Sequence, residues 1–287
     1  MKRFSFLVVA LLVMTTSAFA QFTQSNNAVE TKSSFNGGNF FSKMSTDDYS
    51  RLFVGYNPVS ADWKDLESQI KKMIPMENGL TVGYMYGKNV LKSLPLYVEF
   101  GANVGWIFGK HEDNESEGDY KVTTENSLNM FSLNIPVNVA FRFSFNDNKV
   151  AVTPYLGLNF RFNMAGTLKS TTVMSYYDEY EDENYKATQI LTQNLFSSEE
   201  LDTEDEDAWD VDGDEYDSTM KASTGMGDMA FKRFQVGFNV GVAVDFKSLH
   251  LGIGYVTDFS PIANSEIGDF DFVCKLGVPT ISLGVNF

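Results

Sequence analysis

A strict alternation of apolar residues with small or polar ones constrains this chain more than any other feature. In the clearest segment the intervening positions hold Gly, Asn, Gln, Ala and Asp, while one face carries Phe234, Val236, Phe238, Val240, Val242, Val244 and Phe246. A period of two is the pattern of a β-strand whose two faces meet different environments. The alternation predicts an all-β fold.

Eight segments of the chain follow this pattern. Their residues are 51–57, 80–87, 96–108, 131–145, 150–164, 234–246, 249–257 and 273–287. The polar face is rich in Gly, Asn, Ser and Ala, which suits the narrow interior of a small barrel. The apolar face is uniformly large, as a lipid-facing surface requires. We therefore predict an antiparallel, up-and-down transmembrane β-barrel of eight strands. Ten strands are the alternative if residues 171–177 and 187–196 join the barrel instead of forming an external hairpin.

The connectors between these segments alternate in length. They span residues 58–79, 88–95, 109–129, 146–149, 165–233, 247–248 and 258–272. Outer-membrane barrels have long extracellular loops and short periplasmic turns, so we expect the long connectors outside the cell. The longest, 165–233, is strongly acidic: residues 178–217 hold 17 acidic side chains and the single base Lys186. A short amphipathic helix is expected within residues 63–73.

The first 20 residues have the form of a secretory signal peptide. Lys2 and Arg3 precede an apolar run over residues 4–14, and Ala18-Phe19-Ala20 forms the cleavage site. The run is shorter than the ~20 residues of a membrane-spanning helix. We expect a flexible periplasmic segment at 21–48 and the barrel at 49–287. Cys274 is the only cysteine, so no internal disulfide is possible.

These features resemble the small outer-membrane β-barrels of the OmpA/OmpX type over about Tyr49 to Phe287. The final residue, Phe287, continues the alternation of Ile281, Leu283 and Val285. The resemblance implies a location in the bacterial outer membrane. The partners it implies are outer-membrane lipid and the barrel-assembly machinery, for which Phe287 marks the terminal strand. A net charge of −16 argues against nucleic acid as a partner.

Four charged residues are predicted to lie on the inner face: Glu99, Arg142, Arg161 and Asp245. Glu99 and Arg142 are expected at similar heights on adjacent strands. Buried charges must be paired to offset their desolvation. We expect a salt-bridge network that fills the barrel, and the alternative is a narrow ion path.

Two other groups are candidates for chemistry. Weak calcium binding is suggested by the alternate carboxylates Asp210, Asp212, Asp214 and Asp217, although the spacing is not that of an EF-hand. A Ser/His hydrolase would need a serine beside His111 or His250, the only histidines, and Ser127 and Ser248 are suggested by composition alone.

The sequence favours a structural or surface-interaction protein of the outer membrane, without catalysis or a cofactor. Its extracellular loops would contact an external ligand or an envelope protein. A small-solute or ion channel is the alternative function.

Overall fold

The elements that follow come from a computed structural model, which describes residues 47–63, 67–91, 93–145, 149–178, 183–201, 209–214, 216–267 and 270–287. All of them lie in the unit Ser45–Phe287. The predicted signal peptide and nearly all of the segment 21–48 fall outside the described residues.

In chain order the elements are β1 (Tyr49–Pro58), β2 (Ser60–Trp63), α3 (Glu67–Met73), β3 (Asn78–Asn89), β4 (Leu96–Glu117), β5 (Tyr120–Phe141), β6 (Phe143–Phe145), β7 (Val150–Asp178), β8 (Glu183–Asn194), β9 (Asp210–Gly213), β10 (Asp217–Gly225), the 3-10 helix η3 (Gly227–Met229), β11 (Phe234–Phe246), β12 (Leu249–Asp258), β13 (Ala263–Ile267) and β14 (Phe270–Asn286).

Eight strands form a circuit in which each is hydrogen bonded to two others. The order is β11, β12, β14, β1, β3, β4, β5 and β7, and β7 pairs again with β11. Every pairing in the circuit is antiparallel. Strand β7 is long enough to pair with β11 along 150–162 and with β8 along 167–178. The alternating segments of the sequence lie on these strands.

Within the described residues the sheet has 14 strands, so the expectation of eight accounts for only part of it. Strands β8, β10 and β9 continue the sheet beyond β7, while β2 and β13 pair with β14 and β6 pairs with β7. Residues 171–177 and 187–196 belong to the hairpin of β7 and β8, outside the circuit. Outside the circuit one pairing is parallel, that of β10 with β8. The long connection from Asn194 to Asp217 permits this, because a parallel pair needs a long return path.

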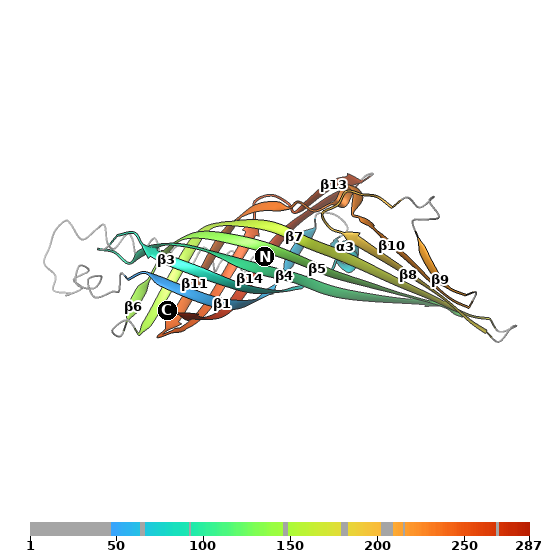
Figure 1. Cartoon of the computed structure of the whole chain (residues 1–287), viewed down its shortest axis with the longest axis horizontal. Helices are drawn as coiled ribbons and strands as arrows, with labels where there is room; N and C mark the ends of the chain where they lie inside the picture. Colours follow the sequence, from blue (N-terminus) through green and yellow to red (C-terminus); the bar gives the residue numbers. More distant parts are fainter. Residues whose placement is uncertain are drawn as a thin grey trace. The chain divides into compact units, whose positions relative to one another are not determined.

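Two predicted loops consist largely of strand. Within 109–129, β4 and β5 continue as a hairpin that turns at Gly118, whose φ of +59° lies in the left-handed region. Within 165–233 lie the second half of β7 and all of β8, β9 and β10. These strands are largely polar on both faces, so they lack the alternation from which strands are predicted. Their backbones can pair all the same, because backbone hydrogen bonds do not require apolar side chains. Figure 1 shows β4, β5, β7 and β8 running side by side here, and we call residues 109–128, 167–194 and 210–225 the extension.

The predicted helix is present but shorter than expected. The expected range was 63–73, and α3 spans Glu67–Met73. Trp63 instead ends strand β2, which pairs with β14. Ile70 is buried and Met73 is 55% exposed. None of the helices in the described residues is both long enough and apolar enough to cross a membrane.

Burial around the circuit is reversed from that of a soluble protein, in which large apolar side chains are inside. Consecutive residues show the reversal, since Ser282 is 8% exposed and Leu283 is 61% exposed. The other strands repeat it. The exposed apolar side chains include Leu52, Val54, Leu80, Val82, Phe100, Val104, Val137, Val139, Leu156, Leu158, Val244, Leu251, Ile253 and Ile281. The circuit therefore has a polar interior and an apolar outer surface.

Glycines on the inner face make room for large aromatic rings. A Cβ on Gly87 would lie 2.3 Å from the ring of Tyr49, the residue opposite it on β1. Gly241 is likewise opposite Tyr155 and close to its side chain, and Gly277 lies close to the side chain of Tyr255. The high glycine content of the polar face thus permits close packing of the interior.

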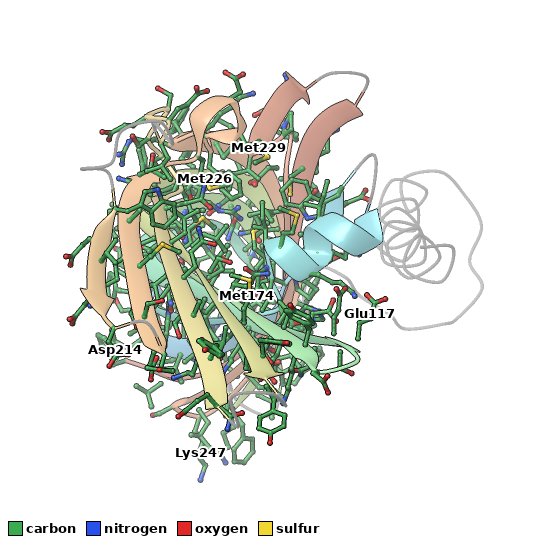
Figure 2. All side chains as sticks on the ribbon, turned by 90° about the vertical axis from the view of Figure 1, so that its right-hand side faces the viewer. Glu117, Met174, Asp214, Met226, Met229 and Lys247 are labelled. Atoms are coloured by element: carbon green, nitrogen blue, oxygen red, sulfur yellow. The ribbon has the colours of Figure 1, made fainter. Side chains whose placement is uncertain are left out.

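The interior becomes apolar toward the extension. Ile107, Leu128 and Leu276 point inward here and form one cluster with Ile70 of α3 and Met226 beside η3. Figure 2 looks onto this end and shows α3 and the segment of Met226 and Met229 lying over it. The circuit is thus covered at this end by a small apolar core.

Candidate functional site

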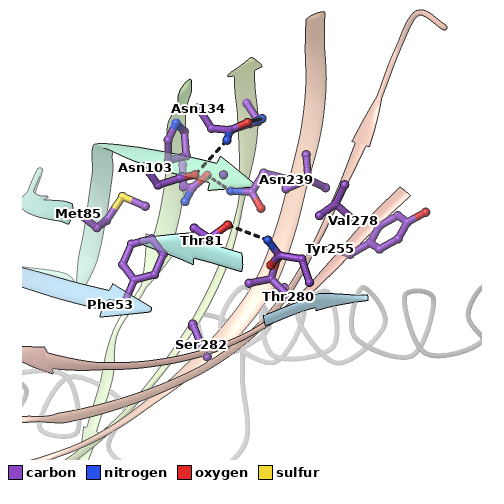
Figure 3. A pocket seen from close by; sticks show the side chains of 18 of the residues that line it. Phe53, Thr81, Met85, Asn103, Asn134, Asn239, Tyr255, Val278, Thr280 and Ser282 are labelled. Atoms are coloured by element: carbon purple, nitrogen blue, oxygen red, sulfur yellow. Dashed lines mark hydrogen bonds between the residues drawn. The ribbon is translucent and has the colours of Figure 1, made fainter. Parts of the chain in front are cut away.

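The candidate site is the polar interior of the circuit. A cavity of about 110 Å³ lies there, with asparagine side chains from several strands around it. Asn134 Nδ2 donates to Asn103 Oδ1 at 3.0 Å, and Asn57 Nδ2 donates to Thr81 Oγ1 at 2.7 Å (Figure 3). A polar cavity of this size has room for a few water molecules.

Glu99 is completely buried at the centre of the first charged cluster. It lies 3.3 Å from Arg51 Nη2, and it accepts hydrogen bonds from the Tyr49 hydroxyl and from Asn138 Nδ2. Glu99 is opposite Asn138 in the register, and Arg142, four residues further along the chain, is not its partner among the described ion pairs. Arg51 of β1 pairs with Glu99 instead.

Arg142 belongs to a second cluster, formed with Asp245 of β11. Arg142 Nη1 lies 2.5 Å from Asp245 Oδ2, and His250 Nδ1 lies 2.9 Å from Asp245 Oδ1. The Arg142 guanidinium also stands 4.5 Å from the centre of the Tyr49 ring. Tyr49 therefore contacts both clusters and links them into one network.

Arg161 forms a third buried ion pair, with Asp258 at the end of β12. Arg161 Nη1 lies 2.8 Å from Asp258 Oδ2, and the two side chains are 4% and 0% exposed. Arg161 Nε also donates to Asn134 Oδ1 at 3.3 Å. In the register Arg161 is opposite Gln235 of β11 and Asn134 of β5. This position places the pair nearer the apolar core than the other two clusters.

Ser282, His250 and Asp245 are connected in the order of a catalytic triad. Ser282 Oγ lies 3.5 Å from His250 Nε2, which is the long limit for a hydrogen bond. Asp245 also pairs with Arg142 through its other carboxylate oxygen. All three side chains are buried inside the circuit. This geometry favours a role in holding β11, β12 and β14 together.

The other candidate residues lie apart from one another. Asp214 Oδ1 accepts the backbone N–H groups of Tyr216 and Asp217, which lowers the pKa of that carboxyl and forms the turn from β9 to β10. Within the described part of the chain, no three His, Cys, Asp or Glu side chains gather as metal ligands would. His111 is opposite Asn126 in the register and Ser127 is opposite Lys110, which places His111 and Ser127 on different faces of the extension.

Sequence reasoning missed Arg51, Tyr49 and Asp258. Arg51 stands on the polar face of its alternating segment, so the period of two was sufficient to find it. Asp258 was assigned to a connector, because the apolar alternation ends at Thr257. Tyr49 lies before the alternating segment 51–57, so the alternation did not identify it.

One exposed ion pair ties α3 to the extension. Lys72 Nζ donates to Asp113 Oδ2 at 2.7 Å, and this contact holds the pKa of the Asp113 carboxyl below its usual range. Asn126 Nδ2 donates to the Lys72 carbonyl oxygen at 3.1 Å. The helix that lies over the apolar core is thus fixed to β4 and β5.

No protein-family model and no curated protein sequence matches this chain. Among solved structures, the chain is similar to Ail, the attachment invasion locus protein of Yersinia pestis, with a TM-score of 0.30, 11% identity, and 84% of this chain and 99% of that chain covered. The same protein in complex with the heparin analogue sucrose octasulfate gives a TM-score of 0.32 at equal identity and coverage. The translocator domain of autotransporter NalP from Neisseria meningitidis gives 0.22 at 10% identity, with 99% and 98% covered. At such low scores these likenesses carry no weight for function.

Proposed function

We propose that this chain is a bacterial outer-membrane protein in which the circuit of eight strands is a closed transmembrane β-barrel, and that its extension contacts partners outside the cell. The reversed burial carries the proposal. Apolar side chains face outward on every strand of the circuit, which is unfavourable in water and favourable against lipid acyl chains.

Aromatic side chains on the outer surface support this orientation. Near the extension, the Trp106 and Phe131 rings stack at 5.8 Å and the Phe162 and Phe234 rings lie 4.9 Å apart. At the other end Phe287 is 70% exposed, and its ring lies 6.4 Å from that of Tyr84. Two aromatic belts are typical of the interfaces of barrel proteins. In this proposal Phe287 also ends the strand that the barrel-assembly machinery recognises.

Topology can be tested by labelling single cysteines in intact cells. The variant Gly118→Cys, in a Cys274→Ser background, places a thiol at the tip of the extension, and Ser248→Cys places one in the turn at the opposite end. We expect a membrane-impermeant maleimide to label the first in intact cells and the second only after permeabilisation. Labelling with the reverse pattern, or of both sites in intact cells, would contradict the proposed topology.

We further propose that the interior does not conduct ions and has no catalytic role. Its charges are paired, and an apolar core covers the end nearest the extension. Planar-bilayer recordings of the purified protein should show no steady conductance. The variant Arg142→Gln should lower stability without opening a path. A regular conductance step that disappears in that variant would instead favour the channel function.

A further inference from the structure

The extension has two unlike faces on the strands β5, β7 and β8. One carries Tyr120, Val122, Met174, Tyr176 and Tyr185, and the ring of Tyr216, just before β10, stacks on that of Tyr185. We call these six residues the tyrosine face. The opposite face of the same strands carries Lys121, Thr123, Val173, Ser175, Tyr177, Lys186 and Thr188. The first face is largely aromatic and the second largely polar.

Four tyrosines form a continuous row across the tyrosine face. The ring centres of Tyr120 and Tyr176 are 4.4 Å apart, those of Tyr176 and Tyr185 are 6.3 Å apart, and those of Tyr185 and Tyr216 are 5.4 Å apart. All three contacts are stacked. With a strand spacing of about 4.8 Å, the row spans about 14 Å. This length matches roughly ten residues of an α-helix.

The tyrosine face is accessible although it is apolar. Tyr120, Met174 and Tyr216 are 60%, 42% and 44% exposed. It lies on the side of the sheet that, nearer the circuit, is buried through Leu128 and Leu168. The tyrosine face thus shares a side of the sheet with the apolar core and is separated from it by Thr124, Asn126, Ser170 and Thr172. Exposed apolar patches of this kind mark interaction sites.

Carboxylates border this surface along β4. Glu117 is opposite Tyr120 and Glu115 is opposite Val122, so both share the tyrosine face. Neither forms an ion pair within the residues that the structure describes. In the hairpin of β9 and β10, by contrast, Asp210, Asp212 and Asp217 share the opposite face with Lys186 and Thr188 of β8. Figure 2 shows Met174 between Glu117 and Asp214. This distribution of charge attracts cations and repels anionic glycans and lipids.

We propose that the tyrosine face binds a cationic amphipathic peptide segment of a partner. Its apolar side chains pack on Met174 and the tyrosine row, and its arginines or lysines contact Glu115 and Glu117. The inference rests on the proposed function, because it assigns the partner chemistry of the extension.

Binding can be measured on the full chain in phosphatidylcholine nanodiscs, with empty nanodiscs subtracted. The probe is a fluorescent helical peptide with leucine on one face and arginine on the other. Two matched peptides replace arginine by glutamate or leucine by serine. We expect the first peptide to bind at least tenfold more tightly than either of these, and its affinity to fall as salt increases.

Variants of adjacent residues separate the two faces. Met174→Ser combined with Tyr120→Ser should weaken binding of the arginine peptide at least tenfold, whereas Val173→Ser combined with Thr123→Ala should leave it unchanged. Glu115→Gln combined with Glu117→Gln removes no apolar contact and should weaken both the affinity and its salt dependence. Equal affinity for the arginine and glutamate peptides, or unchanged affinity in the first double variant, would overturn the proposal.

Failure of this inference can be told apart from failure of the proposed function. The nanodisc measurement does not depend on which side of the membrane the extension occupies. If the thiol of Gly118→Cys is labelled in intact cells but the arginine peptide does not bind in nanodiscs, only the peptide proposal is contradicted. Binding by a protein whose Gly118→Cys thiol is not labelled in intact cells would instead contradict its location outside the cell.

Discussion

At the scale of single residues, two buried carboxylates of the interior, Glu99 and Asp245, are each held by more than one partner. Glu99 contacts Arg51, Tyr49 and Asn138, and Asp245 contacts Arg142 and His250. Several partners are needed because an ion removed from water is costly unless its remaining hydrogen-bonding capacity is also satisfied. Replacing one member of a buried pair should therefore lower the free energy of unfolding by more than the intact pair contributes to it.

The pair of Arg161 and Asp258 gives the sharpest test of this idea. Asp258→Asn leaves a buried guanidinium without its counter-ion and should lower the free energy of unfolding by about 3 kcal/mol. The exposed pair of Lys186 and Asp217, at 3.5 Å, is the matched control, and Lys186→Gln should change stability by less than about 0.5 kcal/mol. Urea unfolding in lipid vesicles measures both values. Equal effects of the two variants would show that burial of the first pair is unimportant.

The contact of Lys72 with Asp113 makes a prediction about a single pKa. Lys72→Gln removes the main cause of the lowered pKa of Asp113, so that pKa should rise toward its usual value. Above the usual pKa the contact with Lys72 helps to hold α3, and this contribution is lost as pH falls through the lowered value. Carboxyl NMR gives the pKa, and hydrogen exchange of the α3 amides should become faster in the variant. An unchanged pKa would mean that other groups lower it.

At the scale of elements, sequence analysis found the circuit but only part of the extension, the hairpin that includes residues 171–177, for one reason. Alternation reports a difference between the two sides of a strand. It is strong where one side is apolar, as in residues 234–246, and weak where both are polar, as in residues 109–128. The extension has paired backbones along β4, β5 and β7 despite this polar content. Its tyrosine row could not be predicted, because the register that aligns Tyr120, Tyr176 and Tyr185 depends on where each hairpin turns.

The packing of strands β1 and β3 predicts that Gly87 cannot be enlarged. Gly87→Val would displace the Tyr49 ring and with it the hydrogen bond to Glu99, so stability should fall by about 2 kcal/mol. Ala102→Val, at an outward position of β4, adds two methyl groups without meeting the interior and should be nearly neutral. Urea unfolding in lipid vesicles compares the two. A similar loss in both variants would contradict the specific packing of Tyr49.

At the scale of the whole unit, two asymmetries account for most of the features described. The circuit has an apolar outer surface and a polar, charged interior, and the extension adds a surface with one aromatic face and one polar face. The sequence predicted the first asymmetry through its period of two. The second arises only when β8 and β10 join β7, which no local pattern specifies.

The most direct test of this account measures what surrounds the outer surface of the circuit. Spin labels at Val54→Cys, Val82→Cys and Leu283→Cys, in a Cys274→Ser background and reconstituted in lipid vesicles, report collisions with oxygen and with a water-soluble nickel complex. A label at Val173→Cys in the extension is the control. We predict that the first three labels collide mainly with oxygen, as in lipid, and the control mainly with nickel. Nickel-dominated collisions at Val54, Val82 and Leu283 would show that these residues face water, and would contradict the membrane-spanning barrel.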